Sequence, residues 1–404
     1  MGRCGECEAV SEDHVDIREA VRKLCAGFGG EHWRAKDRLR EYPAEFVRAM
    51  GDAGFLSALI PTEYGGSGLP LSAAAAILEE VHASGGNGAA CHAQMYVMGT
   101  LLRHGSDVQK AAWLPRIASG ELRLQAFAVT EPGSGSDTLS LETRAVRDGD
   151  DYVITGQKIW TSRAGHSDAM ILLARTSQLG EAASRAVLPV GKARQKRSDG
   201  LSAFIVDMRE AVGNGLSIRA IDTMINHATC ELFFDGLRVP AANLIGKEGQ
   251  GFRTILSGMN AERLLIAAEC IGDARWFVER AAAYAKERIV FGRAIGQNQG
   301  VQFPIARAYA QMRAAELMVA DGLAKYEAGA ECGEEANIAK MLAAEASFAA
   351  GEACLQTHGG FGFASDYDIE RKWRETRLYQ VAPISTNMIL SYIAQHVLGM
   401  PRSY

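Results

Sequence analysis

The sequence lacks several features that mark membrane, secreted or nucleic-acid-binding proteins. No apolar run reaches the roughly 18 residues that a membrane-spanning helix requires. The first residues include the charged Arg3, Glu6 and Glu8 where a signal peptide would have its apolar core. The formal net charge of -5 leaves no excess of positive charge for binding a polyanion such as DNA. We therefore expect a soluble, cytoplasmic protein with no membrane and no nucleic-acid partner.

The cysteines form neither a disulfide framework nor a metal site. Eight of them are scattered through 404 residues, a pattern typical of reduced and mostly buried thiols. Cys4 and Cys7, in "CGEC", have the spacing of two metal ligands. No second pair of cysteines or histidines completes a zinc site, and the nine histidines show no ligand spacing. We expect no bound metal.

One stretch is dense in small residues. "LQAFAVTEPGSGSDT", at positions 124–138, combines hydroxyl side chains with two glycines and a proline that stiffens the turn. Such a backbone allows a ligand to approach closely. Taken alone, these residues favour a purely structural turn between a helix and a strand. The hydroxyl residues are Thr130, Ser134, Ser136 and Thr138.

Three familiar catalytic or nucleotide-binding motifs are absent. "TEPGSGSD" has no lysine, so it is not the phosphate loop of nucleoside triphosphatases. A dinucleotide fingerprint requires a third glycine, and that position is Thr138. The sequence contains no Gly-x-Ser-x-Gly elbow, which disfavours an esterase of the familiar kind.

The hydrophobic period divides the chain into three parts. From Val15 to about Leu122 apolar residues recur at three- and four-residue spacing, which predicts helices. After Gln125 short runs rich in β-branched and aromatic residues predict strands, with no long helices between them to build a doubly wound sheet. From about Asn243 long, alanine-rich helical segments return. They span roughly 251–288, 299–328, 334–358 and 384–398.

Length and composition agree with this division. Hydrophobic residues make up 48% and charged residues 23%, as in an ordinary globular protein, and 404 residues are too many for one small core. We expect an α+β protein with an N-terminal helical domain (1–125), a central β-barrel-like domain (126–241) and a C-terminal antiparallel helix bundle (242–404).

Seven motifs, in order along nearly the whole chain, resemble the acyl-CoA dehydrogenase family. The resemblance implies the same helical, β-barrel, helical architecture, a bound FAD, and assembly as a homotetramer that is a dimer of dimers. The motifs are "IPTEYGGSG", "FAVTEPGSGSD", "GQKIWTS", "NLIGKEGQGF", "AERLLIAAE", "RIVFGRAIGQNQ" and "THGGFGF".

The resemblance assigns cofactor contacts to five places in the chain. The loop around Gly135 is implied to bind the flavin edge and the pyrophosphate, which suits hydroxyl groups and exposed N–H groups that bind a phosphate without a lysine. Trp160 is implied to cover the flavin ring, and the segments near Arg288 and Gln356 are implied to reach the FAD of a neighbouring subunit. The implied FAD residues are Phe127, Val129, Thr130, Gly135, Ser136, Trp160, Thr161, Ser162, Arg288, Phe291, Gln299, Gln356, Gly359, Gly360, Ser385 and Asn387.

The resemblance also implies where the catalytic base lies. The family oxidises the α and β carbons of an acyl thioester, which requires a carboxylate to remove the α-proton. Many members carry it in a C-terminal segment where this sequence has Pro383, which cannot act as a base. A second class, including the isovaleryl-CoA and long-chain enzymes, carries it on a helix, at the position of Glu262. Without the resemblance, Glu262 is better explained as a solvated or capping carboxylate in a helix's charged stripe.

Three further residues are implied to bind substrate. The resemblance places Ser136 and Arg263 near the acyl-CoA, and Asn260 near its CoA chain. Pro383 also has no backbone N–H, so it removes a donor that the family uses at the thioester oxygen, unless Ile384 takes that place.

The resemblance implies α,β-dehydrogenation of an acyl-CoA to the trans-2-enoyl-CoA, with electrons passed to an electron-transfer flavoprotein. A flavin monooxygenase or an enoyl-CoA reductase of the same fold is the alternative, and neither needs Glu262 as a base. A DNA-binding flavoprotein of the alkylation-response type would need a basic face, which the net charge of -5 disfavours.

A basic segment interrupts the predicted strands. "GKARQKRSDG" carries Lys192, Arg194, Lys196 and Arg197, and four cations attract a polyanion at long range. We hypothesise that this segment helps to bind the phosphates of CoA; an ordinary solvated loop explains it equally well.

Overall fold

The computed structural model describes residues 14–177 and 198–402. These residues divide into two compact units. We call residues 14–50, 69–92 and 260–402 the helical unit, and residues 51–68, 93–177 and 198–259 the sheet unit. The "CGEC" segment and the basic residues Lys192 to Arg197 lie outside the described residues, so both hypotheses about them stay untested.

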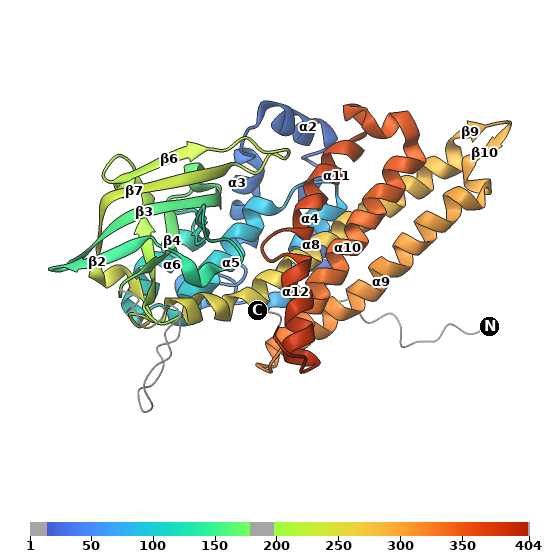
Figure 1. Ribbon diagram of the computed structural model, residues 1–404. Helices are drawn as coiled ribbons and strands as arrows, with labels where there is room; N and C mark the ends of the chain where they lie inside the picture. The colour runs from blue at the N-terminus through green and yellow to red at the C-terminus, as the bar shows by residue number, and fades with distance from the viewer. Residues whose placement is uncertain (1–13, 178–197, 403–404) are drawn as a thin grey trace. The chain divides into compact units, whose positions relative to one another are not determined.

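The sheet unit is built on one sheet with the strand order β6-β7-β3-β2-β4-β5-β8, of which β6, β7, β3, β2 and β4 are labelled in Figure 1. β1 pairs in parallel with β4. Most neighbouring pairs are antiparallel, as expected for strands joined by short turns. The strands are β1 (Leu124–Ala128), β2 (Arg144–Asp148), β3 (Asp151–Ser162), β4 (Ala169–Arg175), β5 (Leu201–Asp207), β6 (Leu216–Ala220), β7 (Thr229–Pro240) and β8 (Leu244–Ile245).

Both faces of this sheet are buried at β4 and β5. Along β4, Ile171 and Leu173 pack in a cluster with side chains of α5 (Ala89–His104) and α6 (Asp107–Ala118), whereas Met170 and Leu172 pack in a second cluster with Phe204 and other strand residues. Alternate side chains of a strand point to opposite faces, so a strand covered on both sides must be apolar throughout. That requirement explains the unbroken apolar run of β4.

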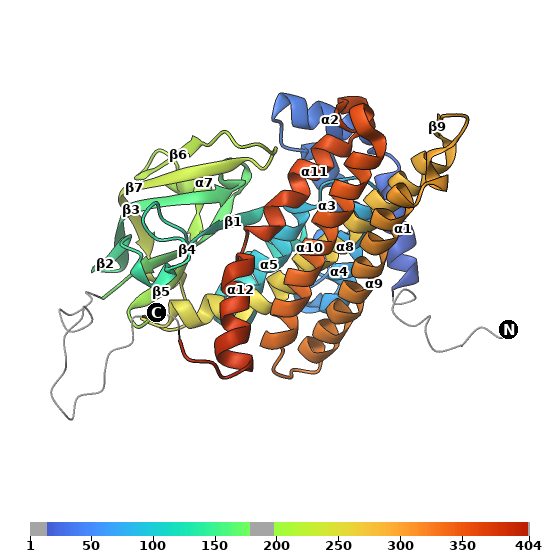
Figure 2. The ribbon, with the colours of Figure 1, turned by 45° about the vertical axis from the view of Figure 1, so that its right-hand side comes forward.

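The helical unit contains the remaining long helices. α9 and α10 lie side by side as an antiparallel pair, and the short β9–β10 hairpin (Ile289–Val290 and Arg293–Ala294) connects α8 to α9 (Figures 1 and 2). The helices are α1 (Val15–Cys25), α2 (Gly30–Leu39), α3 (Ala44–Asp52), α4 (Leu71–Ala83), α8 (Gly251–Glu287), α9 (Gln299–Glu327), α10 (Gly333–His358), α11 (Ile369–Arg377) and α12 (Thr386–Tyr392); α3 and α8 also have residues in the sheet unit, as does α5, and α6 and the short α7 (Met208–Ala211) lie within it.

Small residues cover the buried faces of α4 and α10. Four consecutive alanines, 73–76, are buried on α4, and six alanines are buried on α10. Close approach is most visible at Gly272 of α8, where an added Cβ would lie 2.2 Å from the carbonyl oxygen of Glu79. The core of the helical unit therefore depends on backbones that pack closely.

The predicted succession of helices, sheet and helices is confirmed. The predicted helix over 384–398 is shorter, because α12 ends at Tyr392 and a π-helical turn, Ile393–Val397, follows. The three domain boundaries stay a prediction. None of the helices in the described ranges is both long and apolar enough to cross a membrane.

Candidate active site

The implied flavin loop follows β1 in the sheet unit. Glu131 and Ser134 exchange two backbone hydrogen bonds (N···O 3.2 and 3.0 Å), which close a tight turn, and the Ser134 hydroxyl donates to the carbonyl of Asp137 (2.6 Å). A Cβ added at Gly133 or Gly135 would meet nothing within 4 Å. Since both glycines are exposed, the loop presents accessible backbone, as a phosphate-binding loop must.

A buried ion pair supports this loop from β3. The Lys158 ammonium donates to a carboxylate oxygen of Glu131 (2.8 Å) and to the carbonyl of Val129 (2.8 Å). Burial lowers the pKa of Lys158 to about 8, so it stays largely protonated at neutral pH. Glu131 accepts in addition from the backbone N–H groups of Glu142 and Thr143, and these bonds and Lys158 outweigh burial and lower its pKa. No pattern in the sequence indicates this pair, because its two members lie on different segments.

Trp160 has an unusual backbone for a bulky residue. Its φ of 60° lies in the left-handed region, and the β3–β7 register shifts between Lys158 and Thr161. The indole is 57% exposed, although it is one of the largest apolar side chains. Core packing does not explain a strained backbone that exposes a tryptophan. An exposed indole could instead cover the flat ring of a ligand, which would explain the strain.

The next residues fit a bound flavin as well. The hydroxyl oxygen of Thr161 is buried and has no hydrogen-bond partner within the described ranges. Buried hydroxyls normally have partners, so an absent ligand atom would explain this one. Ser162 follows at the end of β3 and is half-buried.

Glu262 is buried within the helical unit. It lies on α8 with 5% of its surface exposed, and burial raises the pKa of its carboxyl above the ordinary value. The positive charges of Arg263 and Lys340, and that of His92 when protonated, oppose this rise. This burial rules out a solvated position for Glu262 within the unit.

Asn260 and Arg263, the implied substrate residues of α8, contact each other. The Arg263 guanidinium donates to the Asn260 side-chain oxygen (2.9 Å), and the Asn260 amide lies 3.6 Å from the sulfur of Cys332. Burial lowers the pKa of Arg263, and its Nε has no hydrogen-bond partner in the described part of the chain. A buried guanidinium N–H without a partner indicates a place for a ligand acceptor.

The residues implied to reach a neighbouring FAD lie near the hairpin and the end of α10. Arg288 follows α8 and stacks over the ring of Phe361 (5.8 Å), and Phe291 is fully exposed at φ 51°. Gln299 begins α9. Gln356, Gly359 and Gly360 are exposed at the end of α10.

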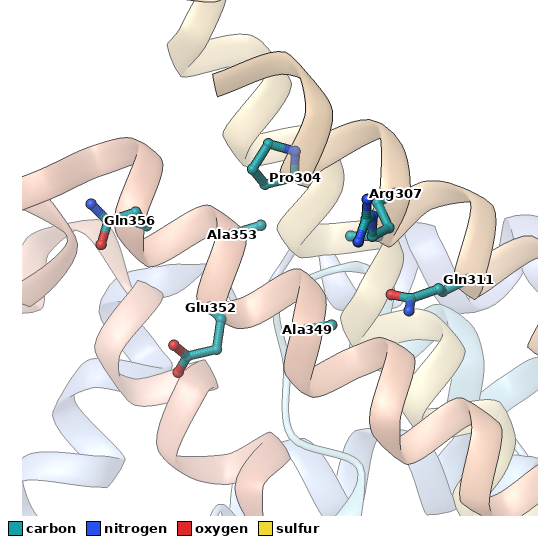
Figure 3. A pocket seen from close by; sticks show the side chains of 8 residues that line it. Pro304, Arg307, Gln311, Ala349, Glu352, Ala353 and Gln356 are labelled. Atoms are coloured by element: carbon teal, nitrogen blue, oxygen red, sulfur yellow. The ribbon is translucent and has the colours of Figure 1, made fainter. Parts of the chain in front are cut away.

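Gln356 also lines a groove of about 500 Å³ between α9 and α10 (Figure 3). Its other polar side chains are Arg307 and Gln311 from α9 and Glu352 from α10. The groove is open, and its lining combines these polar side chains with apolar ones.

Ser385 and Asn387 lie where α12 begins. The Ser385 hydroxyl accepts the Met388 N–H (3.4 Å) and thus caps the helix, and Asn387 is exposed in its first turn. Pro383 is exposed just before them. No group of three or more His, Cys, Asp or Glu that could hold a metal is found among residues 14–177 and 198–402.

Two buried groups near Glu262 were also missed from the sequence. His92 on α5 lies 3.3 Å from a carboxylate oxygen of Glu269, and Lys340 on α10 is fully buried. A charged residue within a helical segment is ordinarily assigned to the solvated face, so periodicity gave no sign of either.

Three family models cover most of the chain. The N-terminal, middle and C-terminal acyl-CoA dehydrogenase domains match residues 11–121, 126–237 and 249–398. Acyl-CoA dehydrogenase fadE12 of Mycobacterium tuberculosis is 34% identical over 397 residues, which cover 98% of each protein. The 3-(aryl)acrylate reductase of Clostridium sporogenes is 32% identical over 393 residues, covering 95% of this chain and 99% of that protein.

Solved structures agree. The acyl-CoA dehydrogenase from Geobacillus kaustophilus has a TM-score of 0.87 at 27% identity, over 96% of this chain and 99% of that chain. The fold and the three family models thus define a flavoprotein oxidoreductase. The chain belongs to the acyl-CoA dehydrogenase family, and FAD is its cofactor.

Proposed function

We propose that this enzyme oxidises an acyl-CoA thioester between its α and β carbons to give the trans-2-enoyl-CoA, and that it passes the electrons to an electron-transfer flavoprotein. The observation that carries the proposal is the buried carboxylate of Glu262 with its raised pKa. A more basic carboxylate is better matched to removing an α-proton at neutral pH.

Different residues of the chain would bind the flavin, bind the substrate and remove the proton. FAD, when bound, supplies the acceptor for the hydride that leaves the β-carbon. Glu262 takes the α-proton. Arg263 and Asn260 contribute donors to bind the acyl-CoA. Trp160 and the loop around Gly135 hold the flavin. Pro383 has no N–H to donate to the thioester oxygen, so that stabilisation has to come from another group.

Glu262→Gln tests the base directly, because it keeps the shape of the side chain and removes its basicity. Under anaerobic conditions the variant should keep its yellow flavin and bind acyl-CoA, and the rate of flavin bleaching should fall by about three orders of magnitude. In the wild type, bleaching should slow as the pH falls through the raised pKa of Glu262, because only the carboxylate accepts the proton.

Glu279→Gln is the matched control, since Glu279 lies on the same helix and is exposed. It should bleach at the wild-type rate. Bleaching of Glu262→Gln at nearly the wild-type rate, with any acyl-CoA that reduces the wild type, would overturn the base assignment. A panel of straight, branched and aromatic acyl-CoAs identifies the substrate class.

A reductase is the second candidate, because one relative is a 3-(aryl)acrylate reductase. The two functions differ in which flavin state reacts. A dehydrogenase bleaches its oxidised flavin with acyl-CoA, whereas a reductase regains the yellow colour when its reduced flavin meets an enoyl compound. Reoxidation by oxygen alone would instead support the monooxygenase alternative.

The exposed segment from Arg288 to Gln299 and the end of α10 support the further proposal that the enzyme works as a homotetramer, a dimer of dimers, with each FAD completed by a neighbouring subunit. Sedimentation of the flavin-loaded protein should give a tetramer; a flavin-loaded monomer would contradict the shared site. The proposed flavoprotein acceptor is tested by its reduction in the presence of substrate.

A further inference from the structure

Lys340 is an unusual lysine of the helical unit. It lies on α10, its side chain is fully buried, and its ammonium donates to two main-chain carbonyls, those of Tyr379 and of Ile384 (2.6 Å). No ion pair of Lys340 is found among residues 14–177 and 198–402. An ammonium whose only hydrogen bonds go to carbonyls has a desolvation cost that no direct ion pair offsets.

Lys372, on α11, shows the more usual arrangement. It is equally buried, but it contacts the carboxylate of Asp273 directly and that of Glu375 at 3.8 Å. A buried charge without such a partner lowers the stability of the fold. The hydrogen bonds or the electric field of such a charge can, however, stabilise another group. Two groups fit that description for Lys340.

The first is the turn that leads into α12. Tyr379 and Ile384 bracket the segment 380–383, and the next residue, Ser385, caps α12. Within the turn, the N–H groups of Val381 and Ala382 both bond to the carbonyl of Leu378. The ammonium therefore ties the two ends of the turn together and fixes where α12 begins.

The second is Glu262. The charge of Lys340 lowers the pKa of Glu262 against the effect of burial, and Glu262 in turn opposes the fall in the pKa of Lys340, which burial brings to about 8. Both residues are buried in the same unit, where charges interact strongly. Other ionisable groups that act on this pair or on its neighbours are His92 of α5, Arg263, Glu269 and Cys270 of α8, Cys332 at the start of α10, Tyr379, and Tyr392 of α12.

We propose that Lys340 is a positioning residue, which holds the Tyr379–Ile384 turn in place and stabilises the ionised form of Glu262. The inference rests on the proposed role of Glu262 as the base. Lys340 itself is not proposed to touch substrate or cofactor. It acts through its hydrogen bonds to the turn and through the electric field of its charge.

Lys340→Met tests both effects, because methionine fills a similar volume without a charge or a donor. Hydrogen exchange in a peptide covering residues 378–388 should be about ten-fold faster, the effect of losing a charge-assisted hydrogen bond. The Glu262 carboxyl band in pH-difference infrared spectra, identified by its loss in Glu262→Gln, should titrate about one pH unit higher. The acid limb of the flavin-bleaching profile should move up by the same amount.

Two comparison variants separate these effects from general loss of structure. Lys340→Arg keeps the charge and the donors, so it should restore both readouts toward wild type. Lys23→Met removes an exposed lysine of the same unit and should change neither. Wild-type exchange and wild-type titration of Glu262 in Lys340→Met would overturn the proposal, as would a change that Lys340→Arg does not correct.

The wild type provides a test even if Lys340→Met does not fold. As the pH rises through about 8, Lys340 loses its charge, so exchange at 378–388, corrected for intrinsic rates, should accelerate in the wild type and not in Lys340→Arg. Equal behaviour of the two proteins would refute the role of Lys340. If no acyl-CoA bleaches the wild-type flavin, the proposed function fails, while exchange and infrared spectra still decide the role of Lys340.

Discussion

Lys158 and Glu131 form an ion pair that restrains the proposed flavin loop at two points. The ammonium holds both the Val129 carbonyl and the Glu131 carboxylate, and that carboxylate holds the backbone at Glu142 and Thr143. Removing one member of a buried pair leaves the other charge without compensation, which typically costs about 3–5 kcal/mol. The loop geometry and the stability of the sheet unit therefore depend on the same side chains.

Lys158→Met should weaken FAD binding by about ten-fold or more, because a loop that is no longer restrained must be ordered by the ligand. Titration of the apoprotein with FAD, followed by quenching of flavin fluorescence, measures the Kd without any turnover. Lys247→Met, an exposed lysine of the same unit, is the control and should leave the Kd unchanged. A variant that is less stable but binds FAD normally would show that the pair only stabilises the sheet.

The sequence made some of these residues predictable and hid others. Trp160 and Glu262 were singled out through motifs of the family. Lys158 and Lys340 were not found, because a lysine is expected at the surface unless its partner is known. Those partners lie far along the chain, and three of them are main-chain carbonyls, which leave no trace in residue identity.

At the scale of elements, α8 passes α4 very closely at Gly272. An added Cβ would meet the Glu79 carbonyl oxygen at 2.2 Å and the Cβ of His82 at 2.8 Å. Both neighbours belong to buried α4, so neither can move aside without shifting the helix. Only a residue without a side chain allows this contact.

Gly272→Ala should lower the free energy of unfolding by about 3 kcal/mol through overpacking, despite the better helix propensity of alanine. Gly300→Ala, in the first turn of α9 where an added Cβ meets nothing within 4 Å, should instead leave stability unchanged or raise it by about 0.5 kcal/mol. Urea denaturation of both variants checks the contrast. Equal stabilities would mean that α8 can move away from α4 without cost.

The spacing of apolar residues along the sequence predicted those helices and strands that are buried through apolar side chains. Strands were expected after Gln125, and β3, β4, β5 and β7 lie there. α11 was not expected, because its sequence "IERKWRETR" is mostly charged. Its buried face is held by ion pairs, such as those from Arg371 to Glu375 (3.0 Å) and from Arg374 to Asp37 (2.7 Å), and such pairs give no periodic apolar signal.

At the scale of the whole molecule, buried thiols link stability to alkaline pH. Burial raises the pKa of Cys25 to about 11 and that of Cys354 to about 12, and it raises that of Cys270 well above its ordinary value of 9.0. Above pH 9.0 the unfolded chain loses protons that the folded protein keeps. The stability from each thiol is therefore complete below pH 9.0 and is lost as the pH rises toward its folded value.

The midpoint temperature of thermal unfolding should consequently fall above pH 9.0. In Cys25→Ala this fall should be less steep, because unfolding then releases one proton fewer. The difference in slope between variant and wild type isolates the thiol. It also removes the opposite contribution of Lys158 and Lys340, whose stability cost declines between pH about 8 and 10.5. Identical slopes for the two proteins, measured by calorimetry, would show that Cys25 ionises alike when folded and unfolded.

The alanine-covered faces of α4 and α10 also affect how this enzyme can change. Where helices meet through methyl groups, nearly every substitution adds volume, and no side chain is available to shrink in compensation. A saturation library should therefore find these positions among the least tolerant in the protein, although none is expected to touch a ligand. Selection for new substrates would have to proceed through residues outside these faces.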